Sequence, residues 1–185
     1  ICRQVPANPA RTFLEAVQSL WLYHVSQWME HNAANYNPGR IDQYLYSYYK
    51  KDVEEGRLTK ERAQELLESL WVKFSELCYI AHLDRVKASP STATQNVCCG
   101  GITEDGQDAV NELSYMMLQA TMNVRLPEPH LGVKYNRKNP DSFLRKAAEL
   151  VALGTGHPLF VNDELGIRHL LDGGIPPEEA YNWNI

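Results

Sequence analysis

The stretch at 97–102, Val-Cys-Cys-Gly-Gly-Ile, constrains the fold of this chain strongly, because every position in it is apolar or small. A run of this kind is typical of a short strand that is covered on both faces. Its two glycines, Gly100 and Gly101, leave out side chains where another backbone or a ligand must come close. Turn residues follow at 104–106, and we predict that Asp108 caps the next helix.

Extended segments and helices alternate after this strand. Apolar segments at 131–135 and 159–161 are predicted strands, and helices are predicted over 108–123, 139–153, 162–171 and 176–180. Strands that are separated by helices indicate a sheet whose connections cross over it. The predicted fold class is therefore α/β, as an open sheet or a barrel.

The first half of the chain is predicted to be mostly helical. Apolar residues recur at helical spacing over 10–29, 41–55 and 59–80. Asn8 is expected to cap the first of these helices, Gly56 to end the second and Thr59 to cap the third. His24 lies on the apolar stripe of the first helix, which favours a core histidine with a satisfied ring nitrogen over a metal ligand.

Composition argues against several classes of function. The net charge of -5 and the scattered basic residues give no support for binding nucleic acid or an anionic membrane. No apolar run is long enough to span a bilayer. The sequence motifs of nucleotide, zinc and serine-hydrolase sites are missing from the sequence. Four cysteines are too few for a disulfide scaffold, so the expected location is the reducing cytoplasm.

The adjacent pair Cys98 and Cys99 is the motif that most invites chemistry. Successive residues of a strand face opposite sides, so at most one of the two thiols can face the interior of a barrel. Free cysteines usually behave as small buried hydrophobes. We therefore expect both side chains to be part of the packed interior.

The segment at 30–40 is polar and carries three asparagines between two apolar helices. Loops of this kind often hold binding groups. A plain connection between two helices fits the same residues equally well, so the residues alone leave both interpretations open.

Several short motifs together resemble one enzyme family. They include Val5-Pro-Ala-Asn-Pro-Ala-Arg-Thr-Phe13, Gly39-Arg-Ile-Asp-Gln-Tyr-Leu-Tyr46, Gln95-Asn96, Gly100-Gly101, Gly154-Thr-Gly-His-Pro158 and Phe160-Val-Asn-Asp-Glu164. In this combination the chain resembles the glycyl radical enzymes of the pyruvate formate-lyase-like branch, essentially from end to end. The resemblance implies an α/β barrel that is rich in helices and contains short buried strands.

The resemblance also implies a reaction mechanism. In that family a glycine near the C-terminus carries a backbone radical, which a separate radical-SAM iron-sulfur activating enzyme installs. The radical oxidises a cysteine on a loop that usually reads Gly-Cys-Val-Glu, and the resulting thiyl abstracts hydrogen from the substrate. That loop is expected just after Ile185. No catalytic residue, bound cofactor or metal site is therefore expected in this chain.

Residues 1–185 are accordingly expected to be the central part of a pyruvate formate-lyase-like domain. The catalytic cysteine loop and the C-terminal glycyl radical domain are expected to lie outside the chain. The resemblance further implies a cytoplasmic homodimer of anaerobic metabolism, whose partners are a small-molecule substrate and the activating enzyme, and not nucleic acid or membrane.

The implied activity is radical cleavage of a C–C, C–O or C–N bond in a small organic substrate, by a lyase of the decarboxylase or dehydratase type. Formate acetyltransferase-type acyl transfer, a non-catalytic structural or binding fragment, and an unrelated α/β binding domain are the alternatives. Alignment with the barrel-mouth regions of the family gives the expected substrate-binding residues, which are His31, Asn35, Thr94, Gln95 and Asn96.

One local departure from the family bears on the substrate. Many relatives read Asn-Gly-His-Ser where this chain reads Asn-Ala-Ala-Asn at 32–35. The loss of the Gly-His pair favours a bulkier and less polar substrate, such as an arylacetate.

Overall fold

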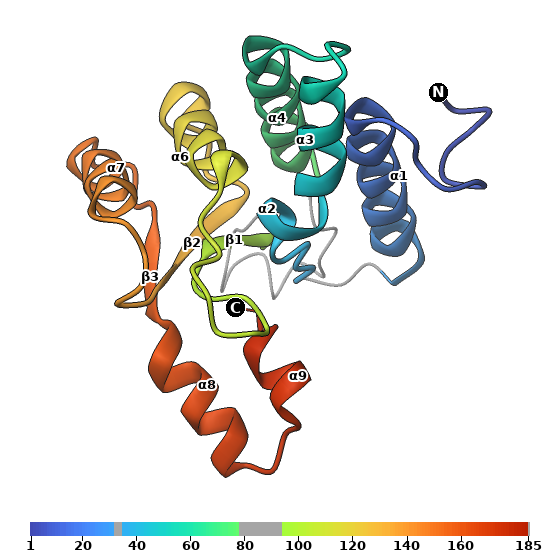
Figure 1. Ribbon diagram of the computed structural model, residues 1–185. Helices are drawn as coiled ribbons and strands as arrows, with labels where there is room; N and C mark the ends of the chain where they lie inside the picture. The colour runs from blue at the N-terminus through green and yellow to red at the C-terminus, as the bar shows by residue number, and fades with distance from the viewer. Residues whose placement is uncertain (32–34, 78–93, 185) are drawn as a thin grey trace, which may run out of the picture.

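The computed structural model describes residues 1–31, 35–77 and 94–184. Figure 1 shows the arrangement of its helices and strands. In chain order these elements are α1 (Phe13–His31), α2 (Ile41–Tyr44), α3 (Tyr46–Glu54), α4 (Lys60–Ser75), β1 (Asn96–Gly100), α6 (Glu112–Val124), β2 (His130–Tyr135), α7 (Asp141–Ala152), β3 (Leu159–Asn162), α8 (Asp163–Asp172) and α9 (Pro177–Tyr181).

The strands form one sheet in the order β1-β2-β3, and both neighbouring pairs are parallel. In this register Cys99 lies opposite Val133, and Val133 lies opposite Phe160. Parallel neighbours need crossover connections, and α6 and α7 supply them between successive strands. The predicted α/β class is therefore confirmed, and each predicted strand is present.

The segment that leads into α2 extends the sheet beyond β1. Isolated parallel bridges join Asn35 to Thr94 and Gly39 to Val97. The backbone N–H of Cys98 donates to the carbonyl of Gly39 at 2.9 Å. Part of the polar segment at 30–40 thus lies along the edge of the sheet, which a purely helical connection would not do.

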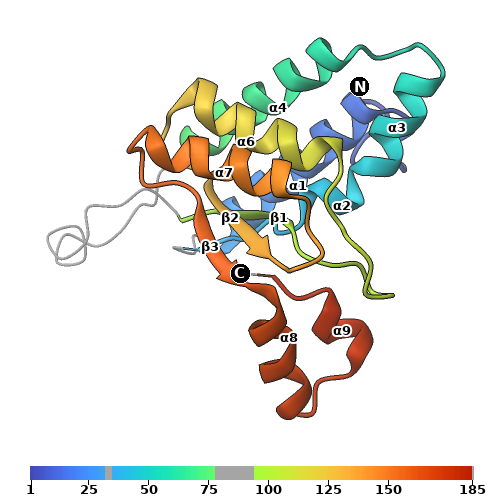
Figure 2. The same cartoon turned by 60° about the vertical axis from the view of Figure 1, so that its left-hand side comes forward.

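The two faces of the sheet have different surroundings. Figure 2 shows α4, α6 and α7 on one side of the strands and α8 with α9 on the other. The face toward the first group carries apolar side chains of the hydrophobic core, namely Val97, Cys99, Leu131 and Val133. The alternate positions Cys98 and Lys134 contact the chain that follows α9. We call this second face the inner face.

Both strand cysteines are fully buried, as predicted, and they point to opposite faces of the sheet. Cys99 belongs to the hydrophobic core, where burial raises the pKa of its thiol well above its ordinary value. The Cys98 thiol lies on the inner face and donates to Asn184 Oδ1 at 3.3 Å. Of the pair, Cys98 is thus the one that faces inward.

The two glycines at the end of β1 have the role that the sequence predicted. Gly100 and Gly101 have φ angles of +80° and +74°. A Cβ on Gly100 would lie 2.8 Å from Phe143 Cε1, and one on Gly101 would lie 2.9 Å from Asp163 Oδ2. The close neighbours are therefore parts of the same protein.

Helix α6 begins later than predicted, and Asp108 does not cap it. The cap is Asn111, whose Oδ1 accepts from the N–H groups of Leu113 and Ser114 at 2.9 and 3.3 Å. The Ser114 hydroxyl accepts in return from the Asn111 N–H, which completes a capping box. Asp108 instead accepts from Asn139 Nδ2 at 2.8 Å. The local pattern could not reveal this distant partner.

Helix α1 also begins later than predicted, because Asn8 does not cap it. The Thr12 hydroxyl accepts from the Glu15 N–H at 3.2 Å, and Asp52 accepts from the Phe13 N–H at 2.7 Å. The second of these acceptors comes from a residue 39 positions away. The first-turn donors are thus satisfied partly by tertiary structure.

The other helix boundaries follow the sequence more closely. Thr59 accepts from the Arg62 N–H at 3.2 Å and caps α4, as predicted. Gly56 has a φ of +70° and follows α3 closely, also as predicted. The helix expected over 41–55 is divided at Leu45 into α2 and α3. The predicted extension of α4 past residue 77 lies outside the described residues.

Candidate functional site

The structure brings three of the expected substrate-binding residues together where β1 begins. Asn35 forms a parallel bridge with Thr94, and the Tyr36 N–H donates to the Thr94 carbonyl at 3.0 Å. Asn96 begins β1, and its backbone N–H donates to Asn37 Oδ1 at 3.1 Å. The backbone thus brings three short polar residues to the amino end of β1.

A cavity of about 200 Å³ opens beside this cluster. Asn96, His130, Thr155 and His157 line it together with apolar residues. The ring centroids of the two histidines are 5.5 Å apart. Burial, followed by the neighbouring His130, lowers the pKa of His157 below its ordinary value of 6.5. His157 is therefore neutral at pH 7 and can take part in hydrogen bonds without carrying charge.

His31 stands apart from this cluster. It is the last residue of α1 and is exposed, as is Asn35. The residues between them, at 32–34, lie outside the described residues, and so does the Ala-Ala pair on which the arylacetate hypothesis depends. No contact among the described residues joins His31 to Thr94 or Asn96.

Gln95 has a supporting position rather than an open one. Its side chain is fully buried, accepting from His24 Nε2 at 2.8 Å and donating to the Phe74 carbonyl at 2.8 Å. Its backbone N–H donates to Glu128 Oε2 at 3.0 Å. These contacts fix the start of β1 against α1 and α4.

The expectation for His24 is confirmed by the same contacts. The ring is 3% exposed and one nitrogen is satisfied by Gln95. Burial lowers the pKa of His24 below its ordinary value. A neutral ring that donates from Nε2 is a structural group of the core.

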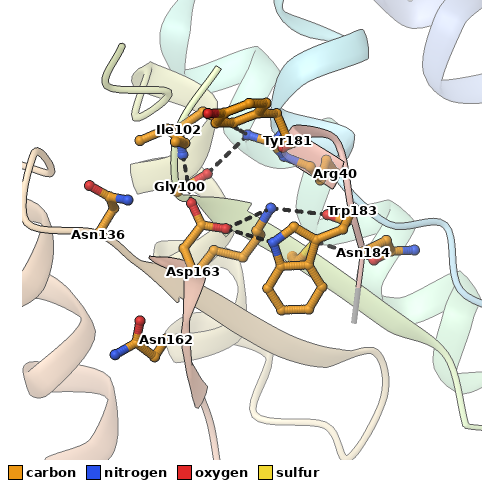
Figure 3. A network of polar contacts seen from close by, with 12 residues as sticks. Arg40, Gly100, Ile102, Asn136, Asn162, Asp163, Tyr181, Trp183 and Asn184 are labelled. Carbon is orange, nitrogen blue, oxygen red and sulfur yellow. Dashed lines mark hydrogen bonds and ion pairs between the residues drawn. The ribbon is translucent and has the colours of Figure 1, made fainter. Parts of the chain in front are cut away.

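The inner face carries a charge network that the sequence did not predict. Lys134 on β2 and Asp163 at the start of α8 are both fully buried, with Nζ and Oδ1 3.0 Å apart. Trp183 Nε1 donates to the same Asp163 oxygen at 2.8 Å, and Lys134 Nζ donates to the Trp183 carbonyl at 3.0 Å. Figure 3 shows the carboxylate of Asp163 and the indole of Trp183 pointing toward one another.

Arg40 adds a second buried cation to this region. Its guanidinium donates to the carbonyls of Gly100 and Ile102 at 3.2 and 2.9 Å, and to the Tyr181 carbonyl at 3.2 Å. Arg40 belongs to one of the motifs that carry the family resemblance, but no pattern linked it to the end of the chain. A lysine inside the otherwise apolar segment at 131–135 was the signal that could have revealed the network.

Comparison with known proteins decides which family these features belong to. The family model described as pyruvate formate lyase-like matches residues 1–185. The chain belongs to the pyruvate formate lyase-like family. Its sequence is 39% identical over 182 residues to trans-4-hydroxy-L-proline dehydratase of Clostridioides difficile, covering 97% of this chain and 23% of that protein.

Solved structures of pyruvate formate lyase-like proteins superpose closely on this chain. One, described for 1,2-propanediol dehydration in Roseburia inulinivorans, has a TM-score of 0.92 at 40% identity and covers 100% of this chain and 23% of its own. A glycyl radical enzyme from Archaeoglobus fulgidus has a TM-score of 0.94 at 35% identity, covering 99% and 24%. The expected resemblance is confirmed, and with it the assignment of the sheet to part of an α/β barrel.

This pyruvate formate lyase-like chain spans less than a quarter of the length of those relatives. Within the described ranges, no group of three His, Cys, Asp or Glu side chains is placed to hold a metal ion. The described helices include none that is long and apolar enough to cross a membrane.

Proposed function

We propose that this chain is part of a glycyl radical lyase that cleaves a C–O bond of a small polar substrate, as a dehydratase. The observation that carries the proposal is the family match over all 185 residues, together with TM-scores of 0.92 and 0.94. Dehydration is favoured because both the hydroxyproline enzyme and the propanediol structure are described by that reaction. Decarboxylation and acyl transfer are the competing reactions.

The chain's own contribution in this proposal is to bind and orient the substrate. Asn35, Thr94 and Asn96 supply amide and hydroxyl groups that fix the direction of a polar substrate, and His31 stands at the rim. Gln95 supports them from the core through its bonds to His24 and Phe74. Placing a substrate in a reactive orientation lowers the barrier because less freedom is lost in the transition state.

The remaining parts of the machinery are proposed to lie outside the chain. Residues 1–185 form the central part of the barrel domain, the reactive cysteine loop follows directly after Ile185, and the radical glycine lies further on. A protein-based glycyl radical, installed by a radical-SAM iron-sulfur activating enzyme, supplies the hydrogen-abstracting chemistry. The full-length enzyme is proposed to be a cytoplasmic homodimer.

Anaerobic activation of the full-length protein tests this function. We expect the activated protein to show a glycyl radical by electron paramagnetic resonance, and to release water from a vicinal diol or a hydroxylated amino acid. Arylacetates, pyruvate with coenzyme A and diols are offered in parallel. Turnover of only an arylacetate would replace dehydration by decarboxylation, and absence of any radical would exclude the class.

The same assay tests the proposed contacts. Asn96→Ala is expected to raise KM about tenfold with unchanged radical content, because loss of one substrate hydrogen bond weakens binding by roughly 1.4 kcal/mol. Gln64→Ala is the matched amide control, because this amide of α4 contacts Glu68 and the Met116 carbonyl of α6 and does not line the cavity. An unchanged KM in Asn96→Ala would remove this residue from the site.

A further inference from the structure

Two buried cations bind the backbone at the end of α9 and just beyond it. Arg40 donates to the carbonyl of Tyr181 at 3.2 Å, and Lys134 donates to the carbonyl of Trp183 at 3.0 Å. Arg40 is 7% exposed and Lys134 is fully buried. The two carbonyls are two residues apart, so both the direction and the position of this segment along the sheet are fixed.

Among the described residues, the bonded partners of the Lys134 ammonium are Asp163 of α8 and Trp183 of this segment. Asp163 lies 3.0 Å away, and the Trp183 ring centroid lies 4.7 Å from Nζ. Burial of a charge is costly unless the charge is paired and hydrogen-bonded. The ion pair, the carbonyl and the aromatic ring together satisfy this requirement. A leucine at the same place would fill the space but would bind neither the carbonyl nor the carboxylate.

Close packing around Trp183 and Asn184 also favours this position of the segment. Gly166 on α8 lies against the Trp183 ring so closely that an added Cβ would collide with the six-membered part of the indole. On the other side, a Cβ on Gly39 would lie 2.7 Å from Asn184 Nδ2. Cys98 contacts the same asparagine through its thiol. Trp183 and Asn184 thus contact residues from four separate parts of the chain.

We propose that Arg40, Lys134 and Asp163 form a polar latch on residues 181–184, and that Lys134 is a positioning residue for the reactive loop that the proposed function places directly after Ile185. The latch fixes the inner-face segment from which that loop departs. It touches neither substrate nor the reacting atoms. It acts only on the position of the reactive loop, and this inference rests on the proposed function.

Lys134→Met in the full-length protein tests the latch directly. Methionine keeps the length and apolar volume of the lysine stem but donates no hydrogen bond. We expect an unchanged yield of glycyl radical after activation and a kcat lower on the order of 100-fold, because a misplacement of about 1 Å costs roughly that factor. KM should change little. Lys50→Met removes an exposed lysine of α3 and is the matched control.

A second variant perturbs the latch without removing any charge. Gly166→Ala favours helix formation in α8 but leaves no room for the indole of Trp183. We expect it to lower kcat as Lys134→Met does. Adding Trp183→Phe, which has a smaller ring, should restore part of the activity of Gly166→Ala. Such recovery is non-additive and is the mark of two residues that act through one contact.

Hydrogen–deuterium exchange on the unactivated full-length protein gives a readout that needs no activity. The peptide covering residues 181–184 should exchange faster in Lys134→Met and in Gly166→Ala than in wild type or Lys50→Met. Unchanged exchange there would overturn the latch. Parallel loss of radical and turnover in both variants would overturn the positioning role in favour of general structural damage. If the wild-type protein stores no radical, the proposed function is contradicted. The exchange experiment would still show whether the latch holds residues 181–184.

Discussion

Replacing Gly100 with alanine is expected to destabilise the protein by about 2–5 kcal/mol, because two separate costs add. Its φ of +80° is a conformation that costs an alanine roughly 1–2 kcal/mol. The new Cβ would lie 2.8 Å from Phe143 Cε1 and 3.0 Å from the Lys134 carbonyl. A backbone oxygen in a paired strand cannot give way easily, and overpacking of this kind costs roughly 1–3 kcal/mol.

Gly56→Ala separates the two costs. Gly56 has a similar φ of +70°, but an added Cβ would meet nothing within 4 Å. We therefore expect this control to lose only the conformational part. Differential scanning calorimetry of the full-length variants should place the unfolding midpoints in the order wild type, Gly56→Ala, Gly100→Ala. Equal shifts in the two variants would mean that close packing behind β1 has no energetic weight.

Asp42→Ala is expected to destabilise the protein by about 2–6 kcal/mol. The Asp42 carboxylate is fully buried, and its Oδ2 accepts from the Gly100 N–H at 3.0 Å and from the Ser114 hydroxyl at 2.7 Å. Its carbonyl also accepts from Asn111 Nδ2, so one residue joins α2, the end of β1 and the cap of α6. Alanine would leave two buried donors unpaired, at roughly 1–3 kcal/mol each. Asp42→Asn keeps an acceptor at this place and should cost less.

The pH dependence of the Asp42→Ala effect has a definite sign. Burial raises the pKa of Asp42 above its ordinary value of 3.8, so the folded protein holds this proton more tightly than the unfolded chain does. The stabilisation due to Asp42 is therefore complete below pH 3.8 and falls as the pH rises through the folded-state pKa. The difference in midpoint between wild type and Asp42→Ala should therefore be smaller at neutral pH than at pH 3.8. A larger difference at neutral pH would contradict the raised pKa.

Much of the fold could be predicted because its signals are local. The strand predicted at 97–102, with its two glycines, was correctly identified as buried, because a parallel sheet covered on both faces requires small or apolar residues. The boundaries that failed, at Asn8 and Asp108, depend on partners far along the chain. Asp52 supplies an acceptor to α1, and Asn139 engages Asp108. Local capping rules cannot see either contact.

The candidate site was predictable only in part, for the same reason. Thr94 and Asn96 are two positions apart in sequence, and Asn35 pairs with Thr94 at the edge of the sheet. The latch has no such signature, because Lys134, Asp163 and Trp183 come from a strand, a helix start and an irregular segment. Their side chains come together only after β2 and β3 have paired and α8 has packed on the inner-face side of the sheet. Only the unexpected charge at position 134 hinted at it.

Arg40 and Lys134 bind the backbone carbonyls of Tyr181 and Trp183 and not the side chain between them. This segment can therefore accept substitutions more easily than insertions or deletions. The exposed side chain of Asn182, between the two held carbonyls, is free to be exchanged, since neither cation contacts it. Inserting or deleting one residue there would bring the wrong carbonyl to Lys134 and turn the indole away from Asp163. In this segment, the number of residues is therefore constrained more tightly than the identity of the side chain at position 182.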